Sequence, residues 1–318
     1  MILITGCAGF VGFHLSLNLL KKKQKILGID NIDDYYDKNL KYNRLKILKS
    51  YKNFNFIKLD LKNFNLLHKK LHKKKIKILV HLAAQPGVRV SIKNPHNTLN
   101  QNLISFINII EIVRIMKIDK FIYASSSSIY GDTKKFPFSE NDKQNIPVSV
   151  YGATKLCNEI IAESYVRNFK IQAIGLRFFT VYGPFGRPDM AYFSFMNDLF
   201  KNRKIKVFNK GKMLRDFTYI DDIIIGIIKL IKLKKKAKHL IINLGKGKPD
   251  KLFDLINNLQ KLTDKKFKIS FIKGVPNGDI KKTYASVKKA KKVIKWKPKI
   301  NLNKGILSFI RWYQNYYE

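Results

Sequence analysis

Short apolar runs recur along the first half of the chain and alternate with longer stretches in which apolar residues return every three to four positions. The runs are typical of buried strands, and the stretches are typical of helices that pack on them. We predict strands at Ile2–Ile4, Ile26–Ile29, Phe54–Leu59, Ile78–Leu82, Lys120–Ala124 and Gln172–Arg177. We predict helices at Phe10–Leu20 and Asn97–Met116, among others. This alternation favours an α/β protein with a Rossmann-type, doubly wound parallel sheet.

Three glycines, Gly6, Gly9 and Gly12, follow the first predicted strand directly and lead into the first helix. A strand, a glycine-rich turn and a helix together form a dinucleotide site, because the glycines let the backbone approach a pyrophosphate on the helix N-terminus. The second strand ends at Asp30, whose carboxylate would accept hydrogen bonds from the adenosine ribose and repel a 2′-phosphate. The sequence therefore predicts NAD rather than NADP.

Beyond about Thr180 the alternation loosens, and turn signals such as Gly183-Pro184 and Pro276-Asn-Gly278 appear. We therefore predict two domains. Residues 1–178 form the NAD-binding Rossmann domain, and parts of about 216–245 return to it. Residues 179–318 form mainly a smaller, mixed α/β substrate lobe.

The net charge changes this picture less than its size suggests. A formal charge of +41 would ordinarily indicate a nucleic acid or an anionic membrane as partner. The excess, however, consists almost entirely of lysines scattered through the chain, as at Lys21–Lys23 and Lys73–Lys75, without interleaved aromatic residues. We therefore expect solvated helix ends and turns and no nucleic-acid partner, with a field that gathers small anionic substrates.

Other whole-chain features point to a cytoplasmic protein. The longest apolar stretch, Ile220–Leu233, contains four charged residues, so we expect no membrane span. The glycine turn begins too early to leave room for a leader peptide. We expect Cys7 and Cys157 to be buried thiols rather than a disulfide pair, as in a reducing compartment. Neither cysteine has a metal-ligand partner at a useful spacing, and we predict no metal.

Tyr151 and Lys155 are candidates for acid/base chemistry. On a helix, residues four apart share a face, so the Lys155 ammonium can approach the Tyr151 phenol and lower its pKa from about 10. A phenol tuned in this way can take a proton from a substrate hydroxyl and return it. The preceding serines, Ser125–Ser128, can hydrogen-bond the same oxygen. The spacing alone also fits an ordinary surface helix, and the glycine turn and the serines favour the catalytic interpretation.

With these residues in place, the chain resembles the extended short-chain dehydrogenase/reductases that act on nucleotide sugars, and most closely the UDP-glucuronate 4-epimerases. The resemblance covers essentially the whole chain. Its general markers are Gly6–Gly12, His81–Ala84, Ser125–Ser128 and the Tyr151/Lys155 pair. Its more specific markers are Asp33–Asp37, Gln85–Ser91, Leu176–Met190 and Phe208–Asp222.

The resemblance implies a set of NAD contacts and a nucleotide-sugar site. The implied cofactor residues are Gly6, Gly9, Phe10, Val11, Gly12, Asp30, Asn31, Asp60, Leu61, Leu82, Ala83, Ala84, Asn102, Ser125, Tyr151, Lys155 and Phe178. The implied catalytic residues are Tyr151, Lys155 and the hydroxyls of Ser126, Ser127 and Ser128, among which the choice stays open. The implied substrate residues are Arg89, Ser126, Thr180, Arg187, Phe208, Arg215 and Asp279. Arg187 would pair with a sugar carboxylate, Arg215 with the diphosphate, and Asp279 would lie near the uridine.

The implied reaction is 4-epimerisation of UDP-glucuronate to UDP-galacturonate through a 4-keto sugar, in a homodimer that serves polysaccharide biosynthesis. Related dehydratases and decarboxylating synthases carry carboxylates where this chain has Ser127 and Ser128, so a plain epimerase is favoured. Two alternatives stay open. One is epimerisation of a neutral sugar, UDP-glucose or UDP-galactose, or of another nucleotide sugar. The other is a catalytically idle NAD-binding module whose basic surface holds RNA.

Overall fold

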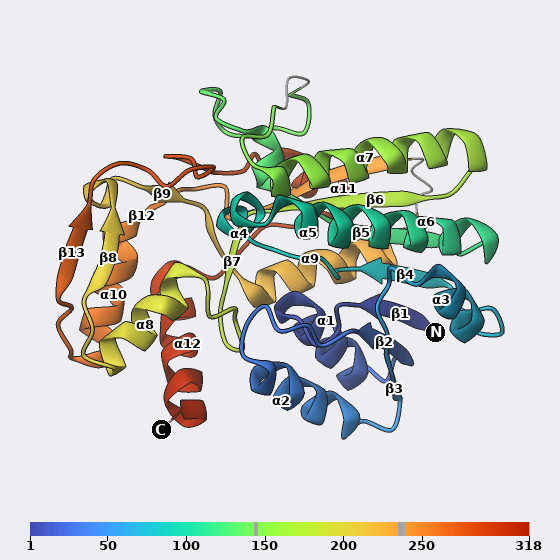
Figure 1. Ribbon diagram of the computed structural model, residues 1–318, viewed down its shortest axis with the longest axis horizontal. Helices are drawn as coiled ribbons and strands as arrows, with labels where there is room; N and C mark the ends of the chain where they lie inside the picture. Colours follow the sequence, from blue (N-terminus) through green and yellow to red (C-terminus); the bar gives the residue numbers. More distant parts are fainter. Residues whose placement is uncertain (143–145, 235–238, 318) are drawn as a thin grey trace.

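The computed structural model describes residues 1–142, 146–234 and 239–317, and its largest element is a parallel sheet with helices on both faces (Figure 1). Seven strands form this sheet in the order β11-β6-β5-β4-β1-β2-β3, and every neighbouring pair is parallel. The strands are β1 (Ile2–Thr5), β2 (Ile26–Asp30), β3 (Phe54–Lys58), β4 (Ile78–His81), β5 (Lys120–Ser126), β6 (Ala173–Phe178) and β11 (His239–Leu244). The predicted α/β class with a doubly wound parallel sheet is confirmed.

Helices cover the two faces of the sheet, and all but α11, which follows β11 in the chain, connect its strands. They are α1 (Phe10–Lys21), α2 (Lys38–Lys49), α3 (Phe64–Leu71), α5 (Pro95–Leu99), α6 (Ser105–Ile115), α7 (Val150–Phe169), α9 (Ile220–Lys232) and α11 (Lys288–Ile294). In Figure 1, α6 and α7 lie on one face of the sheet, and α1 and α9 lie on the other.

The predicted helix from Asn97 to Met116 is interrupted. The chain forms α5, then a π-helical segment over Asn100–Ile104, and then α6. A π segment shifts the residues that follow it around the helix axis, and such segments often lie at functional sites. Asn102, a polar residue, is buried in this segment. The sequence pattern predicts one continuous apolar helix here and does not predict the π segment.

Smaller elements form a second lobe beside the sheet. Its strands pair as β7 (Thr180–Tyr182) with β10 (Phe217–Tyr219), β8 (Ile205–Phe208) with β13 (Ile269–Ile272), and β9 (Leu214–Arg215) with β12 (Asp250–Lys251). Its helices are α8 (Ala191–Phe200), α10 (Leu252–Thr263) and α12 (Leu302–Tyr317). The short helices α4 (Val88–Lys93), η2 (Ser127–Tyr130) and η3 (Asn209–Gly211) complete the fold. The predicted division into two domains stays a prediction, and residues 143–145, 235–238 and 318 lie outside the described ranges.

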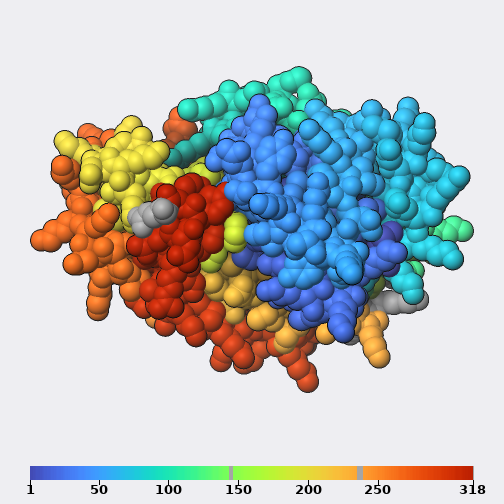
Figure 2. All heavy atoms as spheres, turned by 90° about the horizontal axis from the view of Figure 1, so that it is seen from below, coloured from blue at the N-terminus to red at the C-terminus, as the bar shows by residue number. Residues whose placement is uncertain are grey.

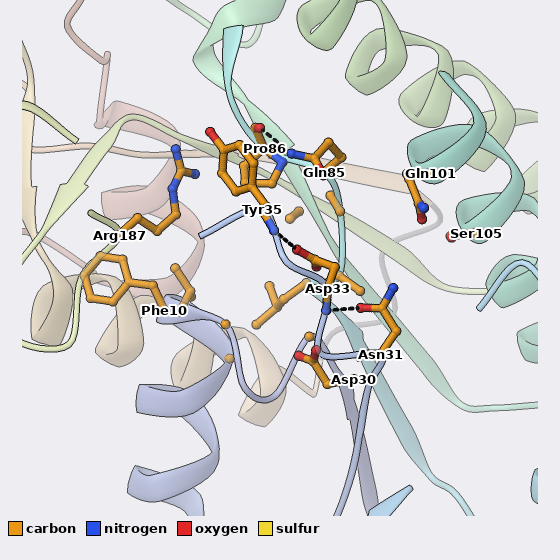
Figure 3. A pocket seen from close by; sticks show the side chains of 18 of the residues that line it. Phe10, Asp30, Asn31, Asp33, Tyr35, Gln85, Pro86, Gln101, Ser105 and Arg187 are labelled. Carbon is orange, nitrogen blue, oxygen red and sulfur yellow. Dashed lines mark hydrogen bonds between the residues drawn. The ribbon is translucent and has the colours of Figure 1, made fainter. Parts of the chain in front are cut away.

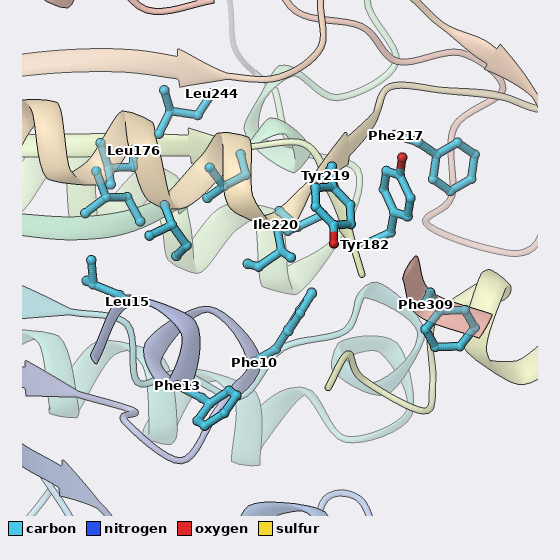
Figure 4. Packing of buried hydrophobic residues seen from close by; sticks show 14 of the residues in the cluster. Phe10, Phe13, Leu15, Leu176, Tyr182, Phe217, Tyr219, Ile220, Leu244 and Phe309 are labelled. Atoms are coloured by element: carbon cyan, nitrogen blue, oxygen red, sulfur yellow. The ribbon is translucent and has the colours of Figure 1, made fainter. Parts of the chain in front are cut away.

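One hydrophobic cluster extends from the large sheet into the smaller lobe. Side chains of β1 alternate between the faces of the sheet, so that Leu3 packs with Phe106 of α6 and Ile4 packs in the cluster that contains Phe13 of α1. The cluster that contains Ile4 and Phe13 also includes Phe309 of α12 in the smaller lobe (Figure 4). On the outside, α12 lies against the N-terminal half of the chain (Figure 2). Asn43 of α2 donates a hydrogen bond to Tyr316 there.

Two whole-chain expectations can be compared with the structure. Within the described ranges, no helix combines the length and the apolar character needed to cross a bilayer. The two cysteines are free; Cys7 is buried as predicted, but Cys157 is exposed. The prediction for Cys157 is wrong because α7 is 20 residues long and Cys157 falls on its solvent side, although its neighbours Lys155 and Asn158 are buried.

Candidate active site

A long cleft runs along the carboxyl ends of the strands of the large sheet, which is where open α/β sheets bind their ligands. Most of the predicted site residues line it: Gly6, Gly9, Phe10, Val11, Gly12, Asp30, Asn31, Asp60, Leu61, Leu82, Ala83, Ala84, Ser125, Ser126, Tyr151, Lys155, Phe178 and Arg187. The other predicted residues lie outside this lining: Arg89, Asn102, Ser127, Ser128, Thr180, Phe208, Arg215 and Asp279. Further polar residues line the cleft (Figure 3): Tyr35 and Gln85 belong to the marker segments Asp33–Asp37 and Gln85–Ser91, whereas Gln101 was not singled out in the sequence.

The glycine turn forms a close-fitting cradle at one end of the cleft. Gly6 has φ +70°, and a Cβ there would lie 2.7 Å from the backbone nitrogen of Ala83. A Cβ on Gly12 would lie 2.0 Å from the carbonyl oxygen of Gly6. The N-cap of α1 is Gly9, which has no side chain to satisfy the free N–H groups at the start of the helix. These groups fit a pyrophosphate, so the residues present fit a dinucleotide.

Asp30 is fixed at the end of β2 next to the cradle. One carboxylate oxygen accepts a hydrogen bond from the Ala8 amide at 3.0 Å, and the other accepts one from the Ile32 amide at 2.9 Å. Burial raises the pKa of this carboxyl, and the two amides oppose that rise. A carboxylate held in this way keeps lone pairs that can accept hydrogen bonds from ribose hydroxyls, and it repels a 2′-phosphate.

Tyr151 and Lys155 share one face of α7, as predicted, but their electrostatics differ from the prediction. Lys155 Nζ lies 5.8 Å from the centroid of the Tyr151 ring and donates a hydrogen bond to the Ala124 carbonyl at 3.1 Å. Burial lowers the pKa of Lys155 to about 8. Burial also raises the pKa of Tyr151, against the opposing effects of Arg187 and of a hydrogen bond with Ser126. The prediction that Lys155 lowers the Tyr151 pKa is therefore wrong for this arrangement, in which desolvation outweighs Arg187 and the Ser126 hydrogen bond, and Lys155 is not among the groups that lower the pKa.

The four serines Ser125–Ser128 differ in position, because β5 ends at Ser126 and η2 begins at Ser127. Ser126 lines the cleft and interacts with Tyr151, and its hydroxyl caps η2 by accepting a hydrogen bond from the Ser128 amide at 3.1 Å. Ser127 and Ser128 belong to η2 and do not line the cleft. The Ser125 hydroxyl donates to Glu159 at 2.5 Å. Of the three candidate catalytic hydroxyls, the geometry favours Ser126.

A buried ion pair of Arg177 with Glu159 lies next to the serine run. Glu159 was not identified from the sequence. Arg177 of β6 donates to both carboxylate oxygens of Glu159, at 2.9 and 2.7 Å, and its third donor reaches the Tyr130 hydroxyl at 2.9 Å. Both charged side chains are almost fully buried. The signal in the sequence is that Glu159 follows Tyr151 and Lys155 at the next helical repeat of four, on the same face of α7.

Asn102 braces the wall of the cleft, and its predicted contact with the cofactor stays a prediction. Its side-chain oxygen accepts a hydrogen bond from the Gln85 amide at 2.7 Å, and its side-chain nitrogen donates to the Gln85 carbonyl and to the Thr154 hydroxyl, both at 3.1 Å. The π segment that carries Asn102 therefore holds the segment after β4 against α7.

Four of the predicted substrate residues meet in a second cluster, which the fold assembles from distant segments. Arg215 Nη2 donates to Asp279 at 2.6 Å, and the Arg89 guanidinium lies 3.9 Å from the same carboxylate. The Arg89 guanidinium also lies over the ring of Phe208, 5.0 Å from its centroid. The cluster thus offers two cations, one carboxylate and an aromatic face. Thr180 opens β7 between Phe179 and Val181, which do line the cleft.

Arg187 is the predicted cation nearest to the acid/base residues. Its guanidinium binds Asp189 through Nε at 3.0 Å and Nη2 at 2.7 Å, and it exerts an electrostatic effect on Tyr151. Figure 3 shows Arg187 and Tyr35 projecting into the same region, near Gln85 and Pro86. In residues 1–142, 146–234 and 239–317, no cluster of His, Cys, Asp and Glu side chains is arranged to hold a metal ion.

Comparison with known proteins agrees with this geometry. Residues 2–245 match the NAD dependent epimerase/dehydratase family. The chain is 45% identical to the uncharacterized protein MJ1055 of Methanocaldococcus jannaschii, over 98% of this chain and 95% of that protein. It is 39% identical to UDP-glucuronate 4-epimerase 2 of Arabidopsis thaliana, over 100% of this chain and 76% of that protein. The structure resembles that of UDP-glucuronic acid 4-epimerase from Bacillus cereus in complex with UDP-glucuronic acid and NAD, with a TM-score of 0.93, 35% identity and 99% coverage of both chains.

Proposed function

The chain belongs to the NAD dependent epimerase/dehydratase family, and we propose that it inverts C4 of UDP-glucuronate to give UDP-galacturonate. Arg187 carries this assignment of an acidic sugar, because it is a largely buried cation in the same cleft as Tyr151 and Ser126. A planar guanidinium suits a carboxylate better than it suits a hydroxymethyl group. The relatives described above that have named activities act on the same acidic sugar.

Tyr151 is the proposed acid/base. Its phenol oxygen takes the proton of the sugar 4-hydroxyl and later returns it to the same oxygen of the sugar. NAD, held by the glycine turn and Asp30, would supply the hydride acceptor and donor for C4 of the sugar. Because burial raises the Tyr151 pKa, the groups that lower it, Arg187 and the Ser126 hydroxyl, help Tyr151 to ionise. Lys155, buried at the junction of α7 and β5, would contact the nicotinamide ribose.

Arg187 has a second task in this reaction. Oxidation at C4 makes the sugar a β-keto acid, which can lose carbon dioxide. A guanidinium that binds the carboxylate stabilises its negative charge and restrains its rotation, and both effects oppose decarboxylation. The chain has serines, Ser127 and Ser128, where decarboxylating relatives carry a carboxylate, which agrees with a plain epimerase.

The UDP part of the substrate fits the second cluster. Arg215 and Arg89 supply positive charge for a diphosphate, and the Phe208 ring supplies a face on which a uracil can stack. Asp279 holds both arginines and is the candidate contact at the uridine end. Thr180, at the start of β7, would hydrogen-bond the sugar.

One observation favours a neutral nucleotide sugar as the second candidate. Asp189 already pairs with Arg187, so a sugar without a carboxylate does not leave a buried cation without a partner. UDP-glucose or UDP-galactose is therefore the main alternative substrate. An idle NAD-binding module is disfavoured, because such a module has no use for the Ser126, Tyr151 and Lys155 arrangement.

We also infer that the protein is a cytoplasmic homodimer. Four exposed apolar side chains lie on neighbouring helices, Ile107 and Ile115 on α6 and Ile160 and Phe169 on α7, and a dimer that pairs through these helices would cover some of them. Both cysteines are free thiols, in keeping with a reducing compartment. The positive charge gathers an anionic UDP-sugar, and the function needs no nucleic-acid partner.

The test is to incubate the purified protein with UDP-glucuronate, without added cofactor, and to follow the sugar by NMR. Formation of UDP-galacturonate supports the acidic substrate, 4-epimerisation and retained NAD together. Conversion of UDP-glucose but not of UDP-glucuronate would instead support the neutral alternative. If neither substrate is converted after addition of NAD, both assignments are refuted.

A further inference from the structure

Two segments that are distant in sequence meet beside Arg187. One is the loop Asp33–Asp37 after β2, and the other is the loop that contains Arg187 and Asp189. The Tyr35 hydroxyl donates a hydrogen bond to Asp189 Oδ2 at 3.0 Å. Asp189 in turn accepts both bonds from Arg187, so that tyrosine, carboxylate and guanidinium form a chain across the cleft.

A second link joins the same two loops one residue further along. Arg44 of α2 is fully buried and donates to the Tyr36 hydroxyl at 2.6 Å. It also donates to the carbonyls of Phe185 at 2.6 Å and Gly186 at 3.0 Å, immediately before Arg187. The backbone that carries Arg187 is therefore fixed independently of its side chain, which leaves the side-chain orientation to Asp189 and Tyr35.

The place of the Tyr35 hydroxyl is defined on its other side by Gly87. This residue has φ +107°, and a Cβ there would lie 2.7 Å from the Tyr35 hydroxyl oxygen. A side chain at position 87 would thus displace the hydroxyl from its position near Asp189.

The pairing leaves one end of the Arg187 guanidinium available. Asp189 occupies Nε and Nη2, whereas Nη1 makes no hydrogen bond within the part of the chain that the structure describes. A second carboxylate can therefore bind at the Nη1 end while Asp189 stays in place. Burial favours the neutral form of Asp189, but Arg187 and Tyr35 outweigh it and hold the Asp189 pKa below its ordinary value, so Asp189 remains an anchoring anion.

We propose that Tyr35 and Asp189 are positioning residues that set specificity for an acidic sugar, by holding Arg187 with its free end toward the sugar carboxylate. This inference rests on the proposed function. Without the anchor, Arg187 must lose side-chain freedom each time it binds the substrate carboxylate. Affinity for the acidic sugar then falls, while the UDP end of the site is unaffected.

The experiment compares Tyr35→Phe and Asp189→Asn with the wild type and with Tyr165→Phe, all saturated with NAD. Tyr165 is a matched control, because its hydroxyl also donates to a carboxylate paired with an arginine, Glu111 with Arg114, on the outer side of α6 and α7. Binding of UDP-glucuronate, UDP-glucose and UDP is measured by calorimetry. Turnover of UDP-glucuronate is followed to separate KM from kcat.

We expect each test variant to bind UDP-glucuronate about 3- to 10-fold more weakly, the cost of immobilising one long side chain. The affinity for UDP and UDP-glucose should not change, KM should rise more than kcat falls, and Tyr165→Phe should match the wild type. Unchanged or tighter UDP-glucuronate binding by Asp189→Asn would mean that Asp189 does not position Arg187, and would overturn the inference. An equal loss for UDP would overturn it too. A wild type without preference for the acidic sugar would instead refute the proposed function itself.

Discussion

The ammonium group of Lys155 lies 5.8 Å from the centroid of the Tyr151 ring, one turn further along α7. It is directed to the carbonyl of Ala124, and burial lowers its pKa to about 8. The folded protein therefore releases this proton at a lower pH than the unfolded chain, in which lysine titrates at about 10.4.

This difference predicts a pH-dependent stability that Lys155→Met removes. Between about pH 8 and 10 the unfolded state holds more protons at this position, so the free energy of unfolding rises with pH there. A lysine pKa lowered to about 8 corresponds to about 3 kcal/mol over the whole window. Urea titrations of both proteins at pH 7.5 and 9.5 should show the wild type gaining stability relative to the variant. If the free energies of unfolding of the wild type and the variant change equally between the two pH values, the lowered Lys155 pKa is contradicted.

Tyr151→Phe should lower turnover by about 10²- to 10⁴-fold, the usual contribution of an acid/base group. The variant keeps the ring and loses only the hydroxyl, so NAD content and UDP-sugar binding should stay close to those of the wild type. Single-turnover NMR assays together with calorimetry separate the two effects. Turnover within a few-fold of the wild type would exclude Tyr151 as the acid/base.

Gly6→Ala should abolish NAD binding. The added Cβ would lie 2.7 Å from the Ala83 nitrogen, in the wall of the cradle, at a φ of +70°. Gly274→Ala is the matched control, because Gly274 has φ +82° and a Cβ added there would have no heavy atom within 4 Å. Both variants carry the same backbone strain of about 1–2 kcal/mol, but only Gly6→Ala should lose the cofactor, as measured by NAD content after gel filtration. Loss of NAD from both would show that strain alone, and not the cradle, is responsible.

Glu159→Gln should destabilise the fold by about 3–5 kcal/mol, because it leaves the buried Arg177 guanidinium without its counter-ion. The pair of the exposed Arg203 with the partly exposed Asp198 provides the comparison, and Asp198→Asn should cost about 1 kcal/mol or less. Urea denaturation measures both. Equal effects would mean that the buried pair contributes no more than a surface pair does.

Ile160→Asp combined with Phe169→Asp should convert a dimer into a monomer. Both side chains are exposed on α7, and a carboxylate at either position opposes its burial between two copies. Light scattering coupled to gel filtration gives the mass of each protein. If the wild type is already monomeric, the proposed homodimer through α6 and α7 is wrong.

Local patterns predicted the elements of the first half of the chain well. Strands β1 to β6 lie within one or two residues of the predicted runs, since each is a short apolar segment bounded by turns. The glycine turn was equally readable, because its spacing encodes the geometry of a single loop. These features depend on residues close together in sequence.

Features that depend on long-range packing were not readable in this way. The pairing of β11 with β6 joins residues 66 positions apart, and no local pattern specifies it. The π segment at Asn100–Ile104 follows from the contacts of Asn102 with Gln85 and Thr154 rather than from helix propensity. The direction of the Lys155 ammonium likewise depends on the neighbouring Ala124 carbonyl, which only the folded sheet supplies.

The edge position of β11 has a consequence for how the protein is made. A fragment that ends at residue 178 lacks the strand that covers β6, and it lacks α9, which packs on α1. Its sheet would end at β6, an inner strand whose side chains are nearly all buried in the complete fold, and its exposed edge would be a site for pairing with other chains. The large sheet therefore cannot be completed during synthesis until Leu244 has left the ribosome, and the early half of the chain must remain protected from aggregation until then.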